Sequence, residues 1–425
     1  MRQVSAPATT TDDRQKGAGW PDVVIGVCVI LWMAEATARL PFQGAWVATI
    51  YAVVLCRMLL RSSAILGALP AAAPALPFVA LCLLSSLWSP VPEVSLIAGV
   101  QLAFTVLCGA WLGQTFGLGG LARLLTLALI LGMIGSALNL AGLSAPTHAR
   151  EGGFLGIYLN KNALGQRAAL LVWTLVFLLQ TSPRPAARLG WACGLALAIW
   201  MLVLSASVSS WAMALAGGGA LVLLGVRRRG GTQWRILAVG LATLATAAAV
   251  ALLMSGTDPV VWLLEATGKD ATLTGRTLLW SIAWEEARAA PLSGLGYMAF
   301  WADPAKAQDV MLIRLMFGPM VSAFHNFLLE TLVALGPGGV AAMLGFLGLC
   351  AARLWRLGAG AARSWAMVSL LAFVTLSALG SSLFRPHEIT LLLVTALLVA
   401  AGAPRRAHER RRAYSRLWRP MTASQ

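Results

Sequence analysis

The sequence predicts an all-α polytopic membrane protein, and three observations support that class. Of its 425 residues, 59% are hydrophobic and 11% are charged, and the mean hydropathy is +0.77; these values are typical of polytopic membrane proteins and not of soluble domains. Apolar runs of roughly 17 to 25 residues, each long enough to cross a bilayer as a helix, recur along the chain. Most basic residues lie between these runs.

We predict about twelve transmembrane helices. A cytoplasmic tail covers residues 1–21, helices 1–9 lie within residues 22–254, and helices 10–12 lie within residues 326–403. A long extracytoplasmic loop with short helices fills residues 255–325, and a basic cytoplasmic tail covers residues 404–425. The predicted spans lie near residues 22–38, 43–60, 68–87, 95–115, 121–143, 161–180, 188–205, 209–226, 235–254, 326–352, 366–384 and 388–403.

The charge pattern supports an even number of spans. With the amino terminus in the cytoplasm, most of the 32 basic residues fall in cytoplasmic loops and tails, as the positive-inside rule requires. The long polar loop then lies outside the cytoplasm. We therefore expect a multi-pass membrane protein whose long polar loop faces the extracytoplasmic side.

Charge and cysteine usage limit the classes of function. The net charge of +16 would suggest nucleic-acid binding in a soluble protein, but here the arginine-rich tail after the last span is typical of an anchor to anionic lipid heads. We expect no nucleic-acid partner. The six cysteines lie within or beside apolar segments and form no CxxC motif, so we expect neither a disulfide nor a metal site.

The first polar cluster surrounds the start of the sixth predicted span. It contains Arg150, Glu151, Lys161 and Arg167 in the stretch REGGFLGIYLNKNALGQR. Charged groups near the membrane are costly and are kept mainly for pairing or function. Lys161 and Arg167 are six residues apart and so lie on different faces of a helix. The alternative for Lys161 is a side chain that extends to the lipid headgroups.

The second cluster is a predicted short helix in the long loop, which begins near Thr274 and ends before Pro291. Arg276 lies in its first turn, where the helix dipole disfavours a cation. An anionic ligand would relieve that conflict, and so would a salt bridge to Glu285 or Glu286. The SGLGY stretch that follows resembles a phosphate-binding loop only weakly, and we interpret it as a turn.

The third cluster opens the tenth predicted span at His325 and Asn326, with Glu330 following. A single histidine is commonly a satisfied polar residue. At the outer mouth of a span, after a cationic loop, it also suits acid–base chemistry or a hydrogen bond to a phosphate. The chain contains no HExxH or GxSxG motif.

These clusters, in this order, resemble the bacterial O-antigen ligase and O-antigen polymerase superfamily, in particular its exopolysaccharide-polymerase branch. The matching sequence motifs lie between about residue 150 and residue 340. They are GIYLNKNALG at 156–165, LSASVSS at 204–210, TGRTLLW at 274–280, PLSGLGYMAFW at 291–301 and HNFLLETLVALGPGG at 325–339.

The resemblance implies a GT-C-like fold and an enzyme that transfers a glycan from a polyprenyl diphosphate carrier to an acceptor sugar, without a metal or other cofactor. It implies catalytic roles for Arg276 and His325 and substrate binding by Lys161 and Asn162. We also expect substrate-binding roles for a further set of residues near these words. This set consists of Arg150, Arg314, Asn326 and Glu330.

Two positions depart from the family pattern. The family often has an arginine where this chain has Leu155, and a basic residue within the Ser-rich word, where this chain has Ala206 and Val208. Arg150 and Arg314 are our candidates for the missing cations.

Three classes of function remain open on the sequence. The first is polymerisation of lipid-linked repeat units, and its nearest alternative is a ligase that moves glycan to a lipid or protein acceptor. The second class is a secondary transporter, but such proteins place charged sites near the bilayer midplane. The third, a structural protein, leaves the cationic loop unexplained. The expected partners are the lipid-linked donor, a glycan acceptor, membrane lipids, and a chain-length regulator and a flippase of the same pathway.

Overall fold

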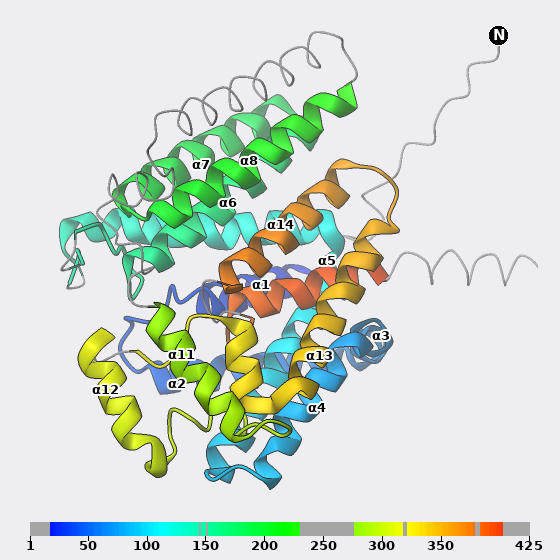
Figure 1. The fold of residues 1–425 in the computed structure, drawn as a ribbon. Coiled ribbons are helices and arrows are strands. Elements are labelled where there is room, and N and C mark those ends of the chain that lie inside the picture. The colour runs from blue at the N-terminus through cyan, green and yellow to red at the C-terminus, as the bar shows by residue number, and fades with distance from the viewer. Residues whose placement is uncertain are drawn as a thin grey trace, which may run out of the picture.

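The computed structural model describes residues 18–143, 146–149, 152–229, 276–317, 321–378 and 383–402. Its helices confirm the all-α class, and within these ranges the extended pairing is a single bridge between His148 and Phe154. The helices (Figure 1) are α1 (Trp20–Met33), α2 (Gln43–Leu60), α3 (Ser62–Ala72), α4 (Leu76–Leu84), α5 (Pro92–Leu138), α6 (Lys161–Thr181), α7 (Pro185–Leu204), α8 (Val208–Arg229), α11 (Arg276–Ala289), α12 (Ala307–Phe317), α13 (Phe327–Trp355) and α14 (Ala361–Ala378), and a further helix covers Ile389–Gly402.

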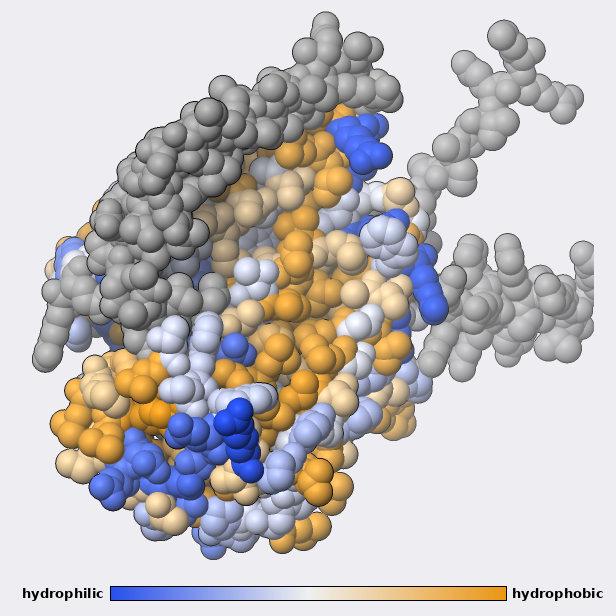
Figure 2. Space-filling model, viewed as in Figure 1, coloured by the Kyte–Doolittle hydropathy of each residue, from blue (hydrophilic) through white to orange (hydrophobic). Residues whose placement is uncertain are grey.

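The long helices suit a membrane. In the described part of the chain, eight helices are long and apolar enough to cross a bilayer, and Trp20–Met33 and Ile389–Gly402 are shorter apolar helices. Figure 2 shows apolar side chains over much of the visible surface, while hydrophilic ones gather over α11 and α12. A broad apolar exterior on helices whose backbone groups are internally bonded is what lipid requires. The predicted span near 235–254 lies outside the described residues, so the count of twelve and the domain bounds stay predictions.

The longest helix, α5, is sharply kinked at Gly117. Its backbone there has φ 59° and ψ −176°, which no helix accommodates. Leu112 and Leu124 would lie about 18 Å apart on a straight helix, yet a side chain added at Gly26 would contact both. The chain therefore bends sharply between the two predicted spans 95–115 and 121–143.

The helix Ile389–Gly402 forms the centre of the bundle, since nearly all its side chains are buried. Its close neighbour is the first half of α5. A Cβ atom at Gly109 would lie 2.5 Å from the carbonyl oxygen of Leu392, and one at Gly113 would lie 2.3 Å from that of Ala396. Glycine lets the two backbones touch, which is how helices pack tightly in lipid. The packing fixes the loop that leads into this helix.

A break in α13 provides a docking site for the SGLGY loop. Pro337 has no N–H, so the carbonyl of Val333 loses its helical partner, and Gly336 adopts φ 64°. The N–H groups of Leu295 and Gly296 donate to the carbonyls of Val333 and Ala334, both at 2.8 Å. SGLGY is therefore a turn held against a broken helix, as predicted.

A pair of glycine variants in α5 tests the close packing. Gly113→Ala should lower the melting temperature in detergent, because the added methyl meets backbone that cannot move aside; overpacking costs about 1–3 kcal/mol. Gly119→Ala is the matched control, since nothing lies within 4 Å of its Cβ position and alanine favours a helix. Equal melting temperatures for both variants would contradict the packing.

Candidate active site

The start of α13 is fixed by Asn326. Its side-chain oxygen accepts hydrogen bonds from the N–H groups of Leu328 at 3.0 Å and Leu329 at 3.2 Å. These are helix donors that otherwise have no partner, and such a cap contributes about 1 kcal/mol. His325 directly precedes Asn326. The cap therefore fixes the backbone on the carboxyl-terminal side of His325.

Glu330 holds the chain on the other side of His325. It lies one turn inside α13 and is 4% exposed. Its carboxylate accepts the N–H of Phe324 at 2.5 Å and the indole N–H of Trp301. A buried carboxylate needs such partners, and these partners are the protein's own. The substrate-binding roles of Asn326 and Glu330 stay predictions, and the contacts above give both a positioning role.

His325 itself adopts a left-handed backbone conformation with φ 55° and is half-buried. Such a conformation costs a non-glycine residue about 1–3 kcal/mol and persists only where the surroundings impose it. Phe300 and Trp301 pack on Phe324 with ring centroids 4.9 and 5.0 Å away. The imidazole is therefore presented from a rigid aromatic frame.

The second predicted catalytic residue, Arg276, is the first residue of α11; its side chain lies outside the described part of the structure. One turn later, the indole of Trp280 donates to the carbonyl of Phe324 at 3.0 Å. The first turn of α11 thus lies against the segment that carries His325. Glu286 is one of the two glutamates that the sequence offered as a salt-bridge partner for Arg276. Its Oε2 atom lies 2.7 Å from Nζ of Lys306, so Glu286 is paired with that lysine.

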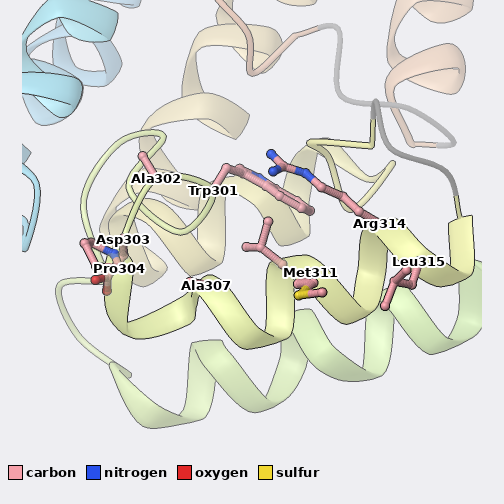
Figure 3. Close-up of a pocket in the computed structure, with 9 residues that line it drawn as sticks. Trp301, Ala302, Asp303, Pro304, Ala307, Met311, Arg314 and Leu315 are labelled. Carbon is pink, nitrogen blue, oxygen red and sulfur yellow. The ribbon is translucent and has the colours of Figure 1, made fainter.

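Arg314 lies on α12 beside a cavity of about 350 Å³. In Figure 3 its guanidinium points from α12 toward Trp301, whose ring packs on Phe324. Its Nε donates to the carbonyl of Val321 at 3.4 Å. Arg314 therefore flanks the His325 segment from the loop side, and its substrate-binding role stays a prediction.

The predicted residues Lys161 and Asn162 open α6, which Asn160 caps by accepting from the N–H of Ala163 at 2.8 Å. The side-chain oxygen of Asn162 accepts from the hydroxyl of Ser207 at 2.9 Å. A Cβ at Gly165 would lie within 3 Å of the serine-rich turn between α7 and α8. The motifs GIYLNKNALG and LSASVSS, which are separated in sequence, are therefore in contact in the folded chain. Arg150 lies outside the described residues, so its role stays a prediction.

Arg167 is the centre of a buried charge network. Its side chain is 6% exposed and lies 3.7 Å from a carboxylate oxygen of Glu35 and 3.8 Å from one of Glu388. Its Nε donates to the carbonyl of Ala34 at 3.2 Å. One guanidinium therefore joins α6, the turn after α1 and the loop before the last helix.

The loop before the last helix connects this network to His325. Arg385 donates to the carbonyl and the hydroxyl of Ser322, three residues before His325. His387 lies 2.5 Å from the hydroxyl of Tyr51 through its Nε2 atom, and burial lowers the pKa of His387 to about 4. Burial raises the pKa of Glu388, while Arg167 opposes that rise.

Two clusters separated in sequence thus lie at one end of the bundle. Contacts run from α6 through Arg167, Glu388 and Arg385 to the start of α13. Sequence reasoning named Arg167 without its partners and gave no role to Glu35, Arg385 or Glu388. The sequence feature that could have indicated Arg385 and Glu388 is FRPHE, a charged motif where the last two predicted spans meet.

The arrangement combines cations with a half-buried imidazole. Cations of this kind hold phosphates and stabilise developing negative charge, and an imidazole transfers protons near neutral pH. Within the described ranges, no group of three or more His, Cys, Asp or Glu side chains could hold a metal ion.

Comparison with known proteins gives two matches. Residues 193–344 match the family model described as O-antigen ligase, a range that contains Arg276, Arg314 and His325. The chain is 29% identical over 260 residues to the exopolysaccharide production protein ExoQ of Rhizobium meliloti (strain 1021). That alignment covers 59% of this chain and 57% of the relative, so the chain spans little more than half of that protein's length. The predicted resemblance to the O-antigen ligase and O-antigen polymerase superfamily is confirmed as a similarity of this chain to both matches.

The pKa of His387 predicts a pH dependence of stability. Because the folded-state pKa of about 4 lies below the ordinary value of 6.5, the unfolded chain takes up the proton first as pH falls. Stability is therefore present above pH 6.5 and is lost between pH 6.5 and pH 4, by an amount on the order of 2 kcal/mol at pH 5. Melting temperatures at pH 7 and pH 5 measure it.

His387→Gln is the comparison that isolates this histidine. Glu388, Glu35, Arg385 and Tyr51 surround it and are unchanged in the variant, so their own pH effects cancel. The raised pKa of Glu388 acts in the opposite direction, since it favours the folded state as pH falls. The wild type should lose more stability than His387→Gln on acidification. An equal loss in both proteins would show that His387 is not held neutral by the fold.

Proposed function

On the premise that this chain is an O-antigen ligase- or polymerase-like protein, we propose that it polymerises polyprenyl diphosphate-linked oligosaccharide repeat units into a surface or exopolysaccharide. The observation that carries the proposal is the His325 segment. A half-buried histidine is held at φ 55° between a helix cap and a buried carboxylate, within the matched range of the family.

The chemistry needs few groups. The acceptor hydroxyl attacks the anomeric carbon of the donor sugar, the bond from that carbon to the diphosphate oxygen breaks, and the diphosphate leaves with the electron pair. The hydroxyl proton passes to the imidazole of His325, acting as general base. Arg276, Lys161 and Arg314 hold the diphosphate and stabilise its developing charge.

The choice between polymerase and ligase is supported by the relative and not by the family model. The relative's name refers to exopolysaccharide production, which favours a polymerase, while the family description is that of a ligase. Transfer of finished glycan to a lipid or protein acceptor is therefore the second candidate. Both reactions use the same donor chemistry.

The setting of the reaction is part of the proposal. We place the protein in the bacterial inner membrane with the His325 end toward the periplasm, because the predicted cytoplasmic loops carry most basic residues. The reaction as proposed needs no metal or other cofactor. The lipid-linked donor, the glycan acceptor, membrane lipids, a flippase and a chain-length regulator are the proposed partners.

Single alanine substitutions test the catalytic assignment. His325→Ala and Arg276→Ala should each reduce polymer by about 100-fold or more, as expected when a general base or a charge-stabilising group is lost. Arg288→Ala is the control for Arg276, because it lies on the exposed face of the same helix. Polymer is measured by size separation, with the amount of protein in the membrane determined in parallel. Normal polymer from either active-site variant would contradict the assignment.

Deletion of the gene separates the candidate functions. Single lipid-linked repeat units should accumulate, because a missing polymerase blocks only the joining of units. Long polymer retained on its carrier would indicate the ligase instead. Unchanged glycans would contradict both and point toward transport.

A further inference from the structure

A second cavity lies beside the charge network, and neither the proposed catalytic step nor the similar proteins assign it a role. It has a volume of about 240 Å³ and lies between the α1–α2 turn and the loop before the last helix. Its lining includes Trp32, Glu35, Gln43, Trp46, Arg385 and Glu388. Pockets that hold drug-sized ligands have volumes of roughly 300–1,000 Å³, so this cavity suits a smaller ligand or one unit of a longer ligand. We call it the Trp32–Glu388 pocket.

The polar groups behind this pocket keep unused hydrogen-bonding capacity. Glu35 Oε2 and Arg167 Nη2 are buried and have no hydrogen-bond partner among the described residues, although their side chains face each other at 3.7 Å. Buried polar atoms are normally satisfied. The Glu35 side chain as a whole lines the pocket and is 32% exposed, so a ligand hydroxyl in the pocket can donate a hydrogen bond to its carboxylate.

The charges of the pocket indicate the chemical class of that ligand. Glu35 and Glu388 face Arg167, and Arg385 is bonded to Ser322, so two anions are balanced by two cations. Two carboxylates disfavour a phosphate here. Carboxylate, amide and guanidinium groups instead offer paired donors and acceptors, which match adjacent hydroxyl groups on a sugar ring.

Aromatic surfaces complete the lining. Trp46 is 51% exposed, and Trp32 packs on His387 with ring centroids 4.5 Å apart. A tryptophan ring offers a large apolar face with a polar edge, and the C–H face of a pyranose packs on such a surface. The combination of these rings with planar polar side chains fits a neutral, polyhydroxylated ligand.

The pocket also lies near the candidate catalytic histidine. Arg385 lines the pocket and bonds to Ser322, and three residues of chain span at most about 11 Å. Ser322 and His325 are three residues apart, so an oligosaccharide of a few sugars reaches from the pocket to the imidazole. We propose that the Trp32–Glu388 pocket binds the acceptor saccharide and presents its terminal hydroxyl toward His325. This inference rests on the proposed function.

The test uses the full-length protein in lipid nanodiscs and a lipid-free oligosaccharide released from the host's own surface polysaccharide as the probe. Binding is measured by calorimetry. Trp46→Ala should weaken binding by at least about tenfold, and Trp46→Phe should restore most of it, because an aromatic face is retained. Trp284→Ala is the control, since Trp284 is similarly exposed, at 46%, and lies outside the pocket.

His325→Ala separates the failure of this inference from failure of the proposed function. It should bind the probe like the wild type while making no polymer. Binding by the wild type and by Trp46→Ala with equal affinity would overturn the pocket assignment and leave Trp46 as a membrane-interface anchor. No binding by the wild type would overturn it as well. Loss of binding in Trp46→Ala together with normal polymer from His325→Ala would support the pocket and contradict the catalytic role of His325.

Discussion

A guanidinium buried in an apolar bundle must be paired, and the pairing of Arg167 determines how the ends of the helices meet. Its two carboxylate partners come from the turn after α1 and from the loop before the last helix. Removal of one partner from such a network leaves an uncompensated buried charge, which costs about 3–5 kcal/mol. The network thus holds together three segments that are far apart in sequence, and through Arg385 it also holds the segment before His325.

Backbone breaks place the other parts of the site. The helix of Ile389–Gly402 packs against glycines of α5 and so fixes the loop of Arg385, His387 and Glu388. The break at Gly336 and Pro337 fixes the SGLGY loop, from which the chain continues to the aromatic frame of Phe300 and Trp301. Small residues and a proline in the bundle therefore determine where the charged and aromatic side chains lie at its end. The glycosyl transfer that we propose depends on this rigidity, because a diphosphate and an acceptor hydroxyl must be held in a fixed relation.

The membrane class, most helix positions and the approximate region of the site follow from the sequence, because apolar length and charge placement are local properties. The helix of α11 and the opening of α13 at Asn326 were predicted from such local signals. The network around Arg167 was not, because the pairing of Glu35, Arg167 and Glu388 joins three distant segments. Likewise, Glu330 was predicted to bind substrate, whereas its contacts with Phe324 and Trp301 appear only once α13 and the aromatic frame are in place. The positioning of His325 could not be predicted for the same reason.

The most direct measurement is a reaction of the purified full-length protein with a lipid-linked repeat unit as both donor and acceptor, with products analysed by mass spectrometry. The account predicts a ladder of products that differ by one repeat unit, with one polyprenyl diphosphate released for each bond formed. Recovery of the substrate unchanged, under conditions in which the protein is folded and binds it, would contradict the assignment of this chain as a glycosyltransferase.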